Sequence, residues 1–224
     1  MRGLVLVNGG RIRCTDSGGD GPAVVLLHGD WTDSALWAPL IPLLRDDFRV
    51  IGYDELAYGG SPPPTAAYTR LGNLRGLLVA PGAHDYPWPT DDPYFREFGQ
   101  RTGGGLVELG LRTWAAASPP AGRRAAESGV TRIARAQFRR AVHAWDKTSV
   151  LCLDDPPVYE RLDAVAAPTV VMVGENEYPM VDQVSRDIAG RITAAKLTVV
   201  PGADHLLPLR SPGAVAAAVR DVTG

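Results

Sequence analysis

Two short segments of the chain carry histidines in settings suited to acid–base chemistry. Residues 24–30, VVLLHGD, predict a buried strand that opens into a loop containing His28 and Gly29. Residues 201–206, PGADHL, predict the end of a strand that presents His205. An unperturbed imidazole titrates near neutral pH, so His205 is a candidate to accept or release a proton under cellular conditions.

A nucleophile to accompany this histidine is not visible in the chain. Between the two segments there is no Gly-x-Ser-x-Gly turn, and no equivalent turn with Cys or Asp at its centre. Ser17 lies in a glycine-rich turn, Ser61 in a proline-rich loop, and Ser118 precedes two prolines. Ser34 is a pocket candidate because it follows the His-Gly loop, although its position favours the start of a helix. We therefore expect no covalent serine chemistry.

Composition limits the function classes. The 224 residues are 45% hydrophobic and 21% charged, with a net charge of −2, which predicts one soluble globular domain over residues 1–224 and argues against a nucleic-acid partner. Cys14 and Cys152 fit no zinc or disulfide spacing, so we expect two free thiols, no metal and no cofactor. The apolar start is too short for a signal or membrane span, which favours a cytoplasmic protein without a membrane partner. The sequence does not indicate the oligomeric state.

The elements that must position these residues alternate between strands and helices. Strands are predicted near residues 3–8, 11–16, 23–28, 48–54, 74–82, 169–174 and 196–200, and helices near 33–44, 181–190 and 212–222. The first two strands predict a hairpin, and the run at 23–28 predicts a strand buried on both faces. Residues 83–147 break the alternation and predict a helical insertion over the sheet. The fold class is therefore α/β with a mostly parallel sheet.

Four motifs in order resemble the α/β-hydrolase family, of the compact bacterial esterase and lactonase kind. The motifs are LHG at 27–29, YDELAYGGS at 53–61, APTVVMVGENE at 167–177 and PGADH at 201–205. The second motif departs from the family at Ala57, where a glycine is expected. Residues 107–114, VELGLRTW, also resemble a lid helix of the family, so the resemblance covers most of the chain and makes 83–147 a helical lid.

The resemblance implies roles for individual residues. His205 corresponds to the catalytic histidine, and Glu177, counted from Gly174, corresponds to the acid that orients it. His28 and Gly29 then shape an oxyanion loop, whose backbone donors lie near two further residues, Asp30 and Trp31. The plainer interpretation is that His205 is a surface-loop histidine and Glu177 a solvated carboxylate.

One segment of the family pattern is missing. Only a dozen residues separate Ser61 from Leu74, whereas a strand–helix crossover needs roughly 30, so a strand with its two flanking helices should be absent. We expect strand 74–80 to move into the vacant slot and pair with strand 23–28. The loop after it would then bring His84 and Asp85 toward the pocket; the alternative is an exposed loop.

Three functions fit these observations. The first is an enzyme of the hydrolase fold that uses His205 for acid–base chemistry on an apolar small molecule, with Trp114 of the lid in the pocket. The second is a non-catalytic relative that binds such a molecule. The third is a shortened form of an ordinary serine esterase or lactonase, since the segments at 68–70 and 71–75 look intact but are joined abruptly.

Overall fold

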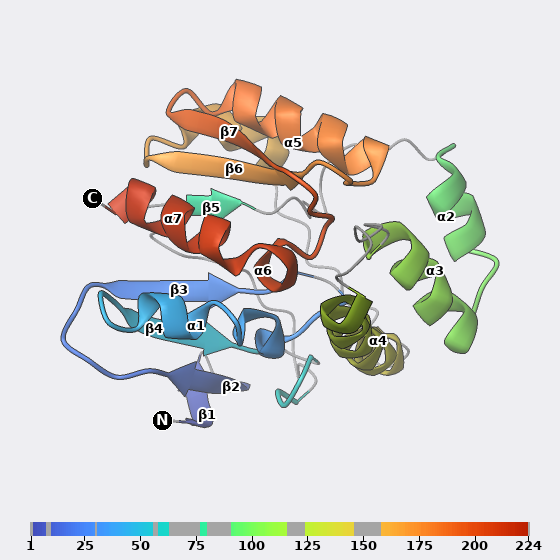
Figure 1. Ribbon diagram of the computed structural model, residues 1–224, viewed down its shortest axis with the longest axis horizontal. Coiled ribbons are helices and arrows are strands. Elements are labelled where there is room, and N and C mark those ends of the chain that lie inside the picture. The colour runs from blue at the N-terminus through green and yellow to red at the C-terminus, as the bar shows by residue number, and fades with distance from the viewer. Residues whose placement is uncertain are drawn as a thin grey trace.

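The strands that the structure describes form two sheets, surrounded by helices (Figure 1). The computed structural model describes residues 2–7, 10–29, 31–55, 58–62, 77–79, 91–115, 124–145 and 158–223. The strands are β1 (Arg2–Val7), β2 (Gly10–Asp16), β3 (Ala23–Leu27), β4 (Arg49–Tyr53), β5 (Leu77–Val79), β6 (Thr169–Gly174) and β7 (Ala195–Val200). The helices are η1 (Ser34–Trp37), α1 (Ile41–Leu44), α2 (Pro93–Phe98), α3 (Gly104–Trp114), α4 (Arg124–Trp145), η2 (Val158–Ala164), α5 (Pro179–Arg191), α6 (Leu207–Arg210) and α7 (Pro212–Thr223).

The first sheet has the strand order β1-β2-β4-β3. β1 and β2 pair in antiparallel register, from Arg2 opposite Thr15 to Val7 opposite Gly10, which confirms the predicted N-terminal hairpin. β3 pairs in parallel with β4. The loop after β3 and the loop after β4 therefore emerge at the same edge of the sheet, where ligands bind in open α/β folds.

The second sheet is wholly parallel and has the order β5-β6-β7. All six residues of β6 are buried, the pattern of a strand covered on both faces. β6 and β7 run in register over their full length, from Thr169 opposite Ala195 to Gly174 opposite Val200. Their carboxyl ends lead into the two loops that carry Glu177 and His205.

The predicted partner of the strand at 74–80 is wrong. Its described part, β5, pairs with β6, and within the described chain β3 pairs with β4 and not with β5. The prediction weighed only the open edge of strand 23–28, but the fully buried β6 also needs a partner on its second side, because unpaired backbone groups in a core are costly. The expected burial of strand 23–28 on both faces is wrong too, since Val25 and Leu27 are 42% and 43% exposed.

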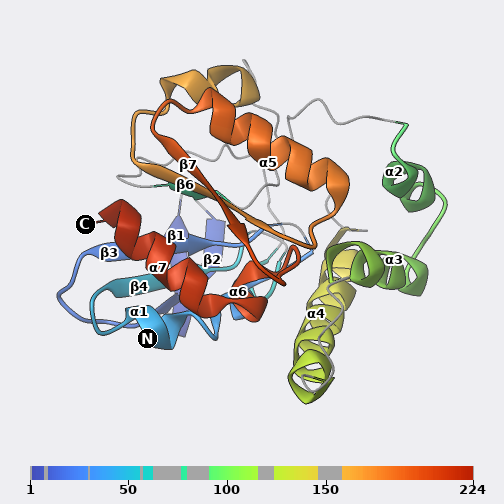
Figure 2. The ribbon, with the colours of Figure 1, turned by 45° about the horizontal axis from the view of Figure 1, so that its top comes forward.

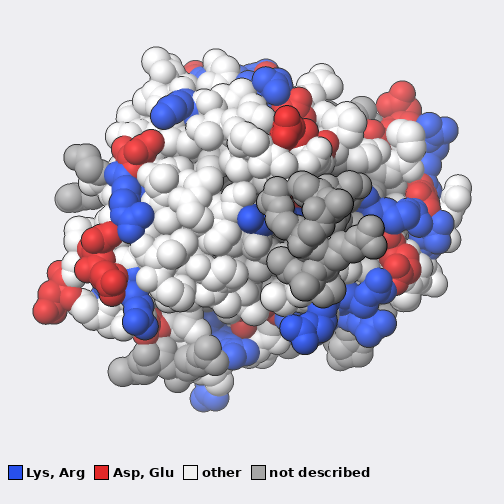
Figure 3. All heavy atoms as spheres, viewed as in Figure 1, with Lys and Arg blue, Asp and Glu red and all other residues white. Residues whose placement is uncertain are grey.

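α7 links the two sheets through the core. It contacts β5 and β6 of one sheet and α1, which packs on β4 of the other. Leu40 and Leu44 at α1 are fully buried in the same cluster as Val215 and Val219 of α7. On the face shown in Figure 3, the area over α7 carries few charged side chains, consistent with its small apolar residues.

Three helices within the predicted insertion lie together to one side of both sheets. α2, α3 and α4 occupy this side in both views (Figures 1 and 2). α3 packs against α2 and α4, and Phe138 of α4 is buried against Gly110 of α3, where a side chain larger than hydrogen would meet its ring. None of the described helices combines the length and apolarity needed to cross a bilayer.

Candidate active site

The structure brings Glu177 and His205 together. The Nδ1 atom of His205 lies 2.9 Å from Oε2 of Glu177, which agrees with the hydrogen bond expected from the sequence. The Glu177 side chain is 2% exposed and that of His205 is 27% exposed. The carboxylate is thus buried behind a ring that still reaches the surface, the arrangement of an orienting acid and an accessible base.

Backbone contacts hold the two loops against each other. The N–H of Glu175 donates to the carbonyl of Val200 at 2.9 Å, and the N–H of Asn176 donates to the carbonyl of Ala203 at 2.8 Å. At Gly174 a Cβ atom would lie 2.4 Å from the Ala203 oxygen, so only glycine allows this approach. The Glu177–His205 pair is therefore prepared by the β6–β7 sheet itself.

Charge and burial shift the pKa of His205 in opposite directions. Burial lowers the pKa of His205, but the charge and hydrogen bond of Glu177, together with the charge of Asp204, outweigh it and leave the pKa raised. Since a carboxylate oxygen only accepts, Nδ1 carries the proton that is donated to Glu177. In neutral His205 the second nitrogen, Nε2, is then free of a proton and can accept one.

Aromatic rings of α2, α3 and the start of α5 lie beside this histidine or beside the ring that contacts it. The Trp114 ring of α3 lies 4.9 Å from the His205 ring, centroid to centroid, at an angle of 42°. Tyr94 of α2 lies 4.9 Å from Trp114, and Tyr178 lies 5.8 Å from it. The structure thus places Trp114, a pocket candidate from the sequence, directly against His205.

The loop after β3 is organised by His28, which is 3% exposed. Its Nδ1 donates to the carbonyl of Gly29 at 2.9 Å, and its Nε2 accepts from the N–H of Glu55 at 3.0 Å. A ring whose two nitrogens are both used by the backbone serves to shape the loop. Asp30 lies outside the described residues, so the backbone donor expected there is not placed.

Trp31 holds the next position in an unusual conformation. Its φ of 69° lies in the left-handed region, which bulky residues rarely adopt. The indole is held edge-on by Phe98 of α2 at 6.0 Å and by Phe138 of α4 at 5.7 Å. Packing against α2 and α4 therefore maintains the strained backbone beside the His-Gly loop.

The serine that follows this loop has a structural position. η1 begins at Ser34, as its helix-starting role predicted, but the capping side chain is that of Asp33, which accepts from the N–H of Ala35 at 3.0 Å. The Ser34 N–H donates to Asp54 at 2.8 Å. In the described part of the chain, His205 has no hydrogen bond to a serine hydroxyl, and the pair it forms is with Glu177.

The sequence placed Asp33 at the start of a helix, but it did not indicate that this residue anchors α4. The Asp33 carboxylate is buried and accepts from Gln137 Nε2 at 3.1 Å and from Arg140 Nε at 2.8 Å, both on α4. Burial raises the pKa of Asp33, but the hydrogen bonds from Arg140 and Gln137 leave it lowered. Its only sequence signal was the place before a helix, because the partners lie more than a hundred residues away.

Comparisons with known proteins agree with this geometry. Residues 22–107 match the model of the alpha/beta hydrolase fold family. An enol-lactonase from Burkholderia xenovorans LB400 is 19% identical, with a TM-score of 0.75 over 98% of this chain and 99% of that one. A carboxylesterase from Bacillus subtilis is 17% identical, with a TM-score of 0.72 over 99% of this chain and 90% of that one. The chain has the α/β-hydrolase fold.

Proteins that are similar to this chain in sequence have names that differ in the activity they state. A fluoroacetate dehalogenase of a Burkholderia species is 42% identical over 66 residues, which are 30% of this chain and 21% of that protein. An uncharacterized protein of Mycobacterium tuberculosis is 30% identical over 196 residues, 84% of this chain and 64% of that protein. The probable oxidoreductase EphD of the same species is 46% identical over 52 residues, 22% of this chain and 9% of that protein. The chain therefore spans less than two thirds of the length of these relatives.

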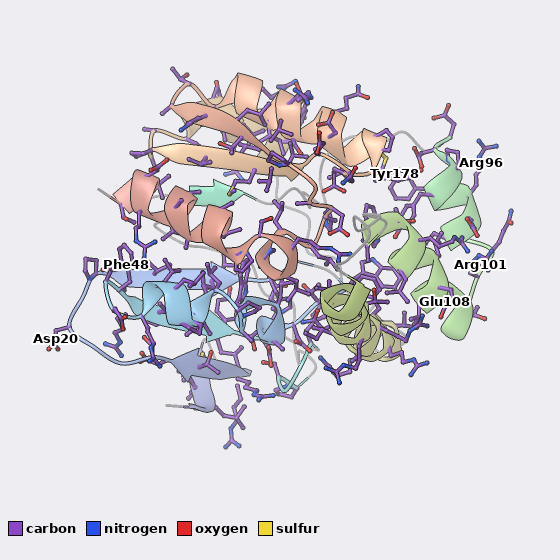
Figure 4. The ribbon with its side chains drawn as sticks, in the orientation of Figure 1. Asp20, Phe48, Arg96, Arg101, Glu108 and Tyr178 are labelled. Carbon is purple, nitrogen blue, oxygen red and sulfur yellow. The ribbon has the colours of Figure 1, made fainter. Side chains whose placement is uncertain are left out.

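A cavity of about 270 Å³ adjoins the acid side of this α/β-hydrolase site. It lies between α2, α3 and the loop before α5, and is lined by Pro93, Tyr94, Glu97, Leu109, Arg112, Thr113, Asn176, Glu177, Tyr178 and Pro179. Figure 4 shows Tyr178 between the start of α5 and α2, where its hydroxyl donates to Asp92 at 2.8 Å. His84 and Asp85 lie outside the described residues, so their predicted place in the pocket is not tested. The described residues hold no cluster of His, Cys, Asp or Glu suited to a metal ion.

Proposed function

We propose that this α/β-hydrolase-fold protein binds a small apolar molecule and acts on it by acid–base chemistry centred on His205. In this proposal Nε2 of His205 takes a proton from water or from the ligand, while Glu177 fixes the ring and stabilises the imidazolium. The aromatic lid, with Trp114 on the histidine, provides the apolar wall of the site. The reaction class is ester or lactone hydrolysis, or a related elimination.

The observation that carries this proposal is the buried Glu177 hydrogen-bonded to a partly exposed His205. A structural ion pair would have no need of a ring that reaches the surface, whereas a base needs one nitrogen oriented and the other accessible. Three of the described serines, Ser17, Ser61 and Ser185, support a role without covalent catalysis, because their hydroxyls bond to groups other than His205. Ser17 contacts Gly18 and Val50, and Ser61 contacts Arg13 and Asp54.

Labelling with a fluorophosphonate tests the absence of an activated serine. We expect no labelled peptide after incubation of the pure protein, because the probe requires a serine with an adjacent base. Stoichiometric labelling of any serine would contradict the proposal, and labelling at Ser34 would identify the nucleophile. A known serine esterase, labelled in parallel, controls for the quality of the probe.

Hydrolysis of p-nitrophenyl acetate and of γ-butyrolactone tests the acid–base role. We expect turnover above the buffer rate that falls about 10²-fold or more in His205→Asn, the lower range for a lost general base. The exposed Asp182→Asn variant should retain the wild-type rate. Turnover equal to buffer for both probes would reject the enzyme and leave the ligand-binding protein, which equilibrium binding of the same molecules then tests.

A second candidate is a shortened serine hydrolase, and the division into two sheets favours it. β3 and β5 each have a described partner on one side only, β4 and β6. An ordinary sheet of this family would place one further strand, followed by the nucleophile, between them. The nucleotide sequence around codon 70, with the mass of the natural product, decides between the two candidates, because a longer product would carry the missing serine.

A further inference from the structure

A buried ion pair joins residues on either side of His205, the proposed base. Asp204 is 1% exposed, and the side chain of Arg210, at the end of α6, is 8% exposed. The guanidinium donates to Oδ2 of Asp204 from Nε at 3.0 Å and from Nη2 at 2.8 Å. The second oxygen, Oδ1, accepts from the N–H of Leu206 at 3.0 Å. The Asp204 side chain therefore spans the backbone of His205.

The remaining contacts of this loop do not fix His205 in the same way. α6 has only four residues, too few to be stable alone. The carbonyl of Leu206, just before this helix, accepts from the N–H groups of Leu209 and Arg210. These backbone bonds to the Leu206 carbonyl link the turn at His205 to α6, and Asp204 adds a side-chain link from the residue before His205. Arg210, the last residue of α6, makes this link because its guanidinium binds the Asp204 carboxylate.

Stability by itself is a poor explanation for this pair. Two charges lose their hydration when they are buried, and an apolar pair of the same size is often as stable or more so. A charged pair, however, has a directional geometry, since the planar guanidinium meets one carboxylate at a defined angle. Such geometry suits a contact whose purpose is to orient its neighbour.

We infer that Asp204 and Arg210 are positioning residues for His205, which hold its backbone so that Nδ1 stays on Glu177 and Nε2 faces the ligand. This inference rests on the proposed function only for the role of Nε2. Among the described residues, the ring of His205 contacts Glu177 from the loop after β6 and the uncharged Trp114 of α3, and the charge of Asp204, paired with Arg210 of α6, acts on it from its own loop.

The double variant D204N/R210M tests this inference by NMR of the His205 ring. It removes both charges together, so no unpaired charge is buried and the fold should be retained. We expect the Nδ1 proton to exchange with water about tenfold faster, the equivalent of one net hydrogen bond. The pKa of His205 should also fall, because the Asp204 charge that raises it is gone.

The matched control is D182N/R186M, which removes the exposed ion pair of α5, four residues apart. It should change neither the proton exchange nor the titration of His205. An unchanged Nδ1 proton in a folded D204N/R210M protein would overturn the inference. If the double variant does not fold, Asp204→Glu replaces it, since this change keeps the charge but displaces the carboxylate, and an unchanged Nδ1 proton there would equally overturn it.

These readouts need no turnover, so they separate the two proposals. A protein that hydrolyses nothing but shows the expected loss of Nδ1 protection would reject the enzyme and keep the positioning role. The reverse result would keep the enzyme and reject the positioning role.

Discussion

Glu177 governs the charge of His205 through a single short contact. Its carboxylate is buried, so little water screens the 2.9 Å hydrogen bond to the imidazole. The consequence is a histidine whose pKa is raised and whose neutral, proton-accepting form exists only at higher pH. Activity that depends on His205 as a base should therefore increase as the pH rises through the raised pKa of His205.

Replacing Glu177 by Gln should shift the pH dependence of the activity to lower pH. The amide keeps the shape of the side chain but removes the charge, so the burial of His205 is no longer opposed by Glu177. We expect the midpoint of the pH–rate profile, and of the His205 NMR titration, to move down relative to wild type. An unmoved midpoint would show that Glu177 is not the partner in solution. Glu160→Gln, the same change at an exposed carboxylate of η2, is the matched control.

The same pair predicts how stability depends on pH. A histidine with a raised folded-state pKa stabilises the fold fully below its unfolded value, near 6.5, and this contribution is lost as the pH rises through the folded value. Glu177→Gln should consequently lower the free energy of unfolding more at pH 5.5 than at pH 9. Urea unfolding at both pH values measures this difference, and an equal loss at both would contradict the assignment.

Among the elements, α4 is tied to the loop after β3 more firmly than its distance in sequence suggests. Gln137 and Arg140 bind Asp33, while Phe138, between them, packs on Trp31. α4 and the loop after β3 thus share three contacts, made by residues within about one turn of the helix. Movement of α4 would release the strained backbone of Trp31 and change the orientation of its N–H.

Asp33→Ala should destabilise the protein by about 1–2 kcal/mol. The change removes the cap of η1, typically about 1 kcal/mol, together with a partly exposed ion pair to Arg140 that contributes at most about 1 kcal/mol. Asp182→Ala, which removes an exposed pair on α5, should cost no more than about 0.5 kcal/mol. Urea unfolding of both variants measures the difference, and equal losses would show that Asp33 does not anchor α4.

At the scale of the whole molecule, the two sheets differ in how completely they are covered. β6 has partners on both sides and six buried residues. β1, at the edge of the other sheet, exposes Leu4 and Leu6 by 57% and 71%. The stability of the protein should therefore be concentrated around β6, next to the residues that form the candidate site.

Hydrogen exchange tests this distribution. Amides of β6 should exchange only through global unfolding and so be the slowest of the chain, whereas β1 should exchange faster through local fraying. Mass spectrometry of peptides from 169–174 and 2–7 gives the comparison. Equal rates would mean that the second sheet opens as readily as the edge hairpin, and that Glu177 and His205 are not held on a rigid base.

The sequence by itself determined the hairpin and most of the strands, which depend on local patterns. The pairing of Glu177 with His205 was expected from the resemblance to the α/β-hydrolase family, and it forms because the two loops follow adjacent parallel strands. The sequence could not determine the partner of β5, because an apolar strand fits any open edge and only the burial of β6 decides between them. It marked Asp33 as part of a helix start but did not show its contact with Arg140, nor the left-handed backbone of Trp31. Both arise from contacts between α4 and a loop about a hundred residues away. Such contacts leave no periodicity in a single chain, so only the tertiary structure decided them.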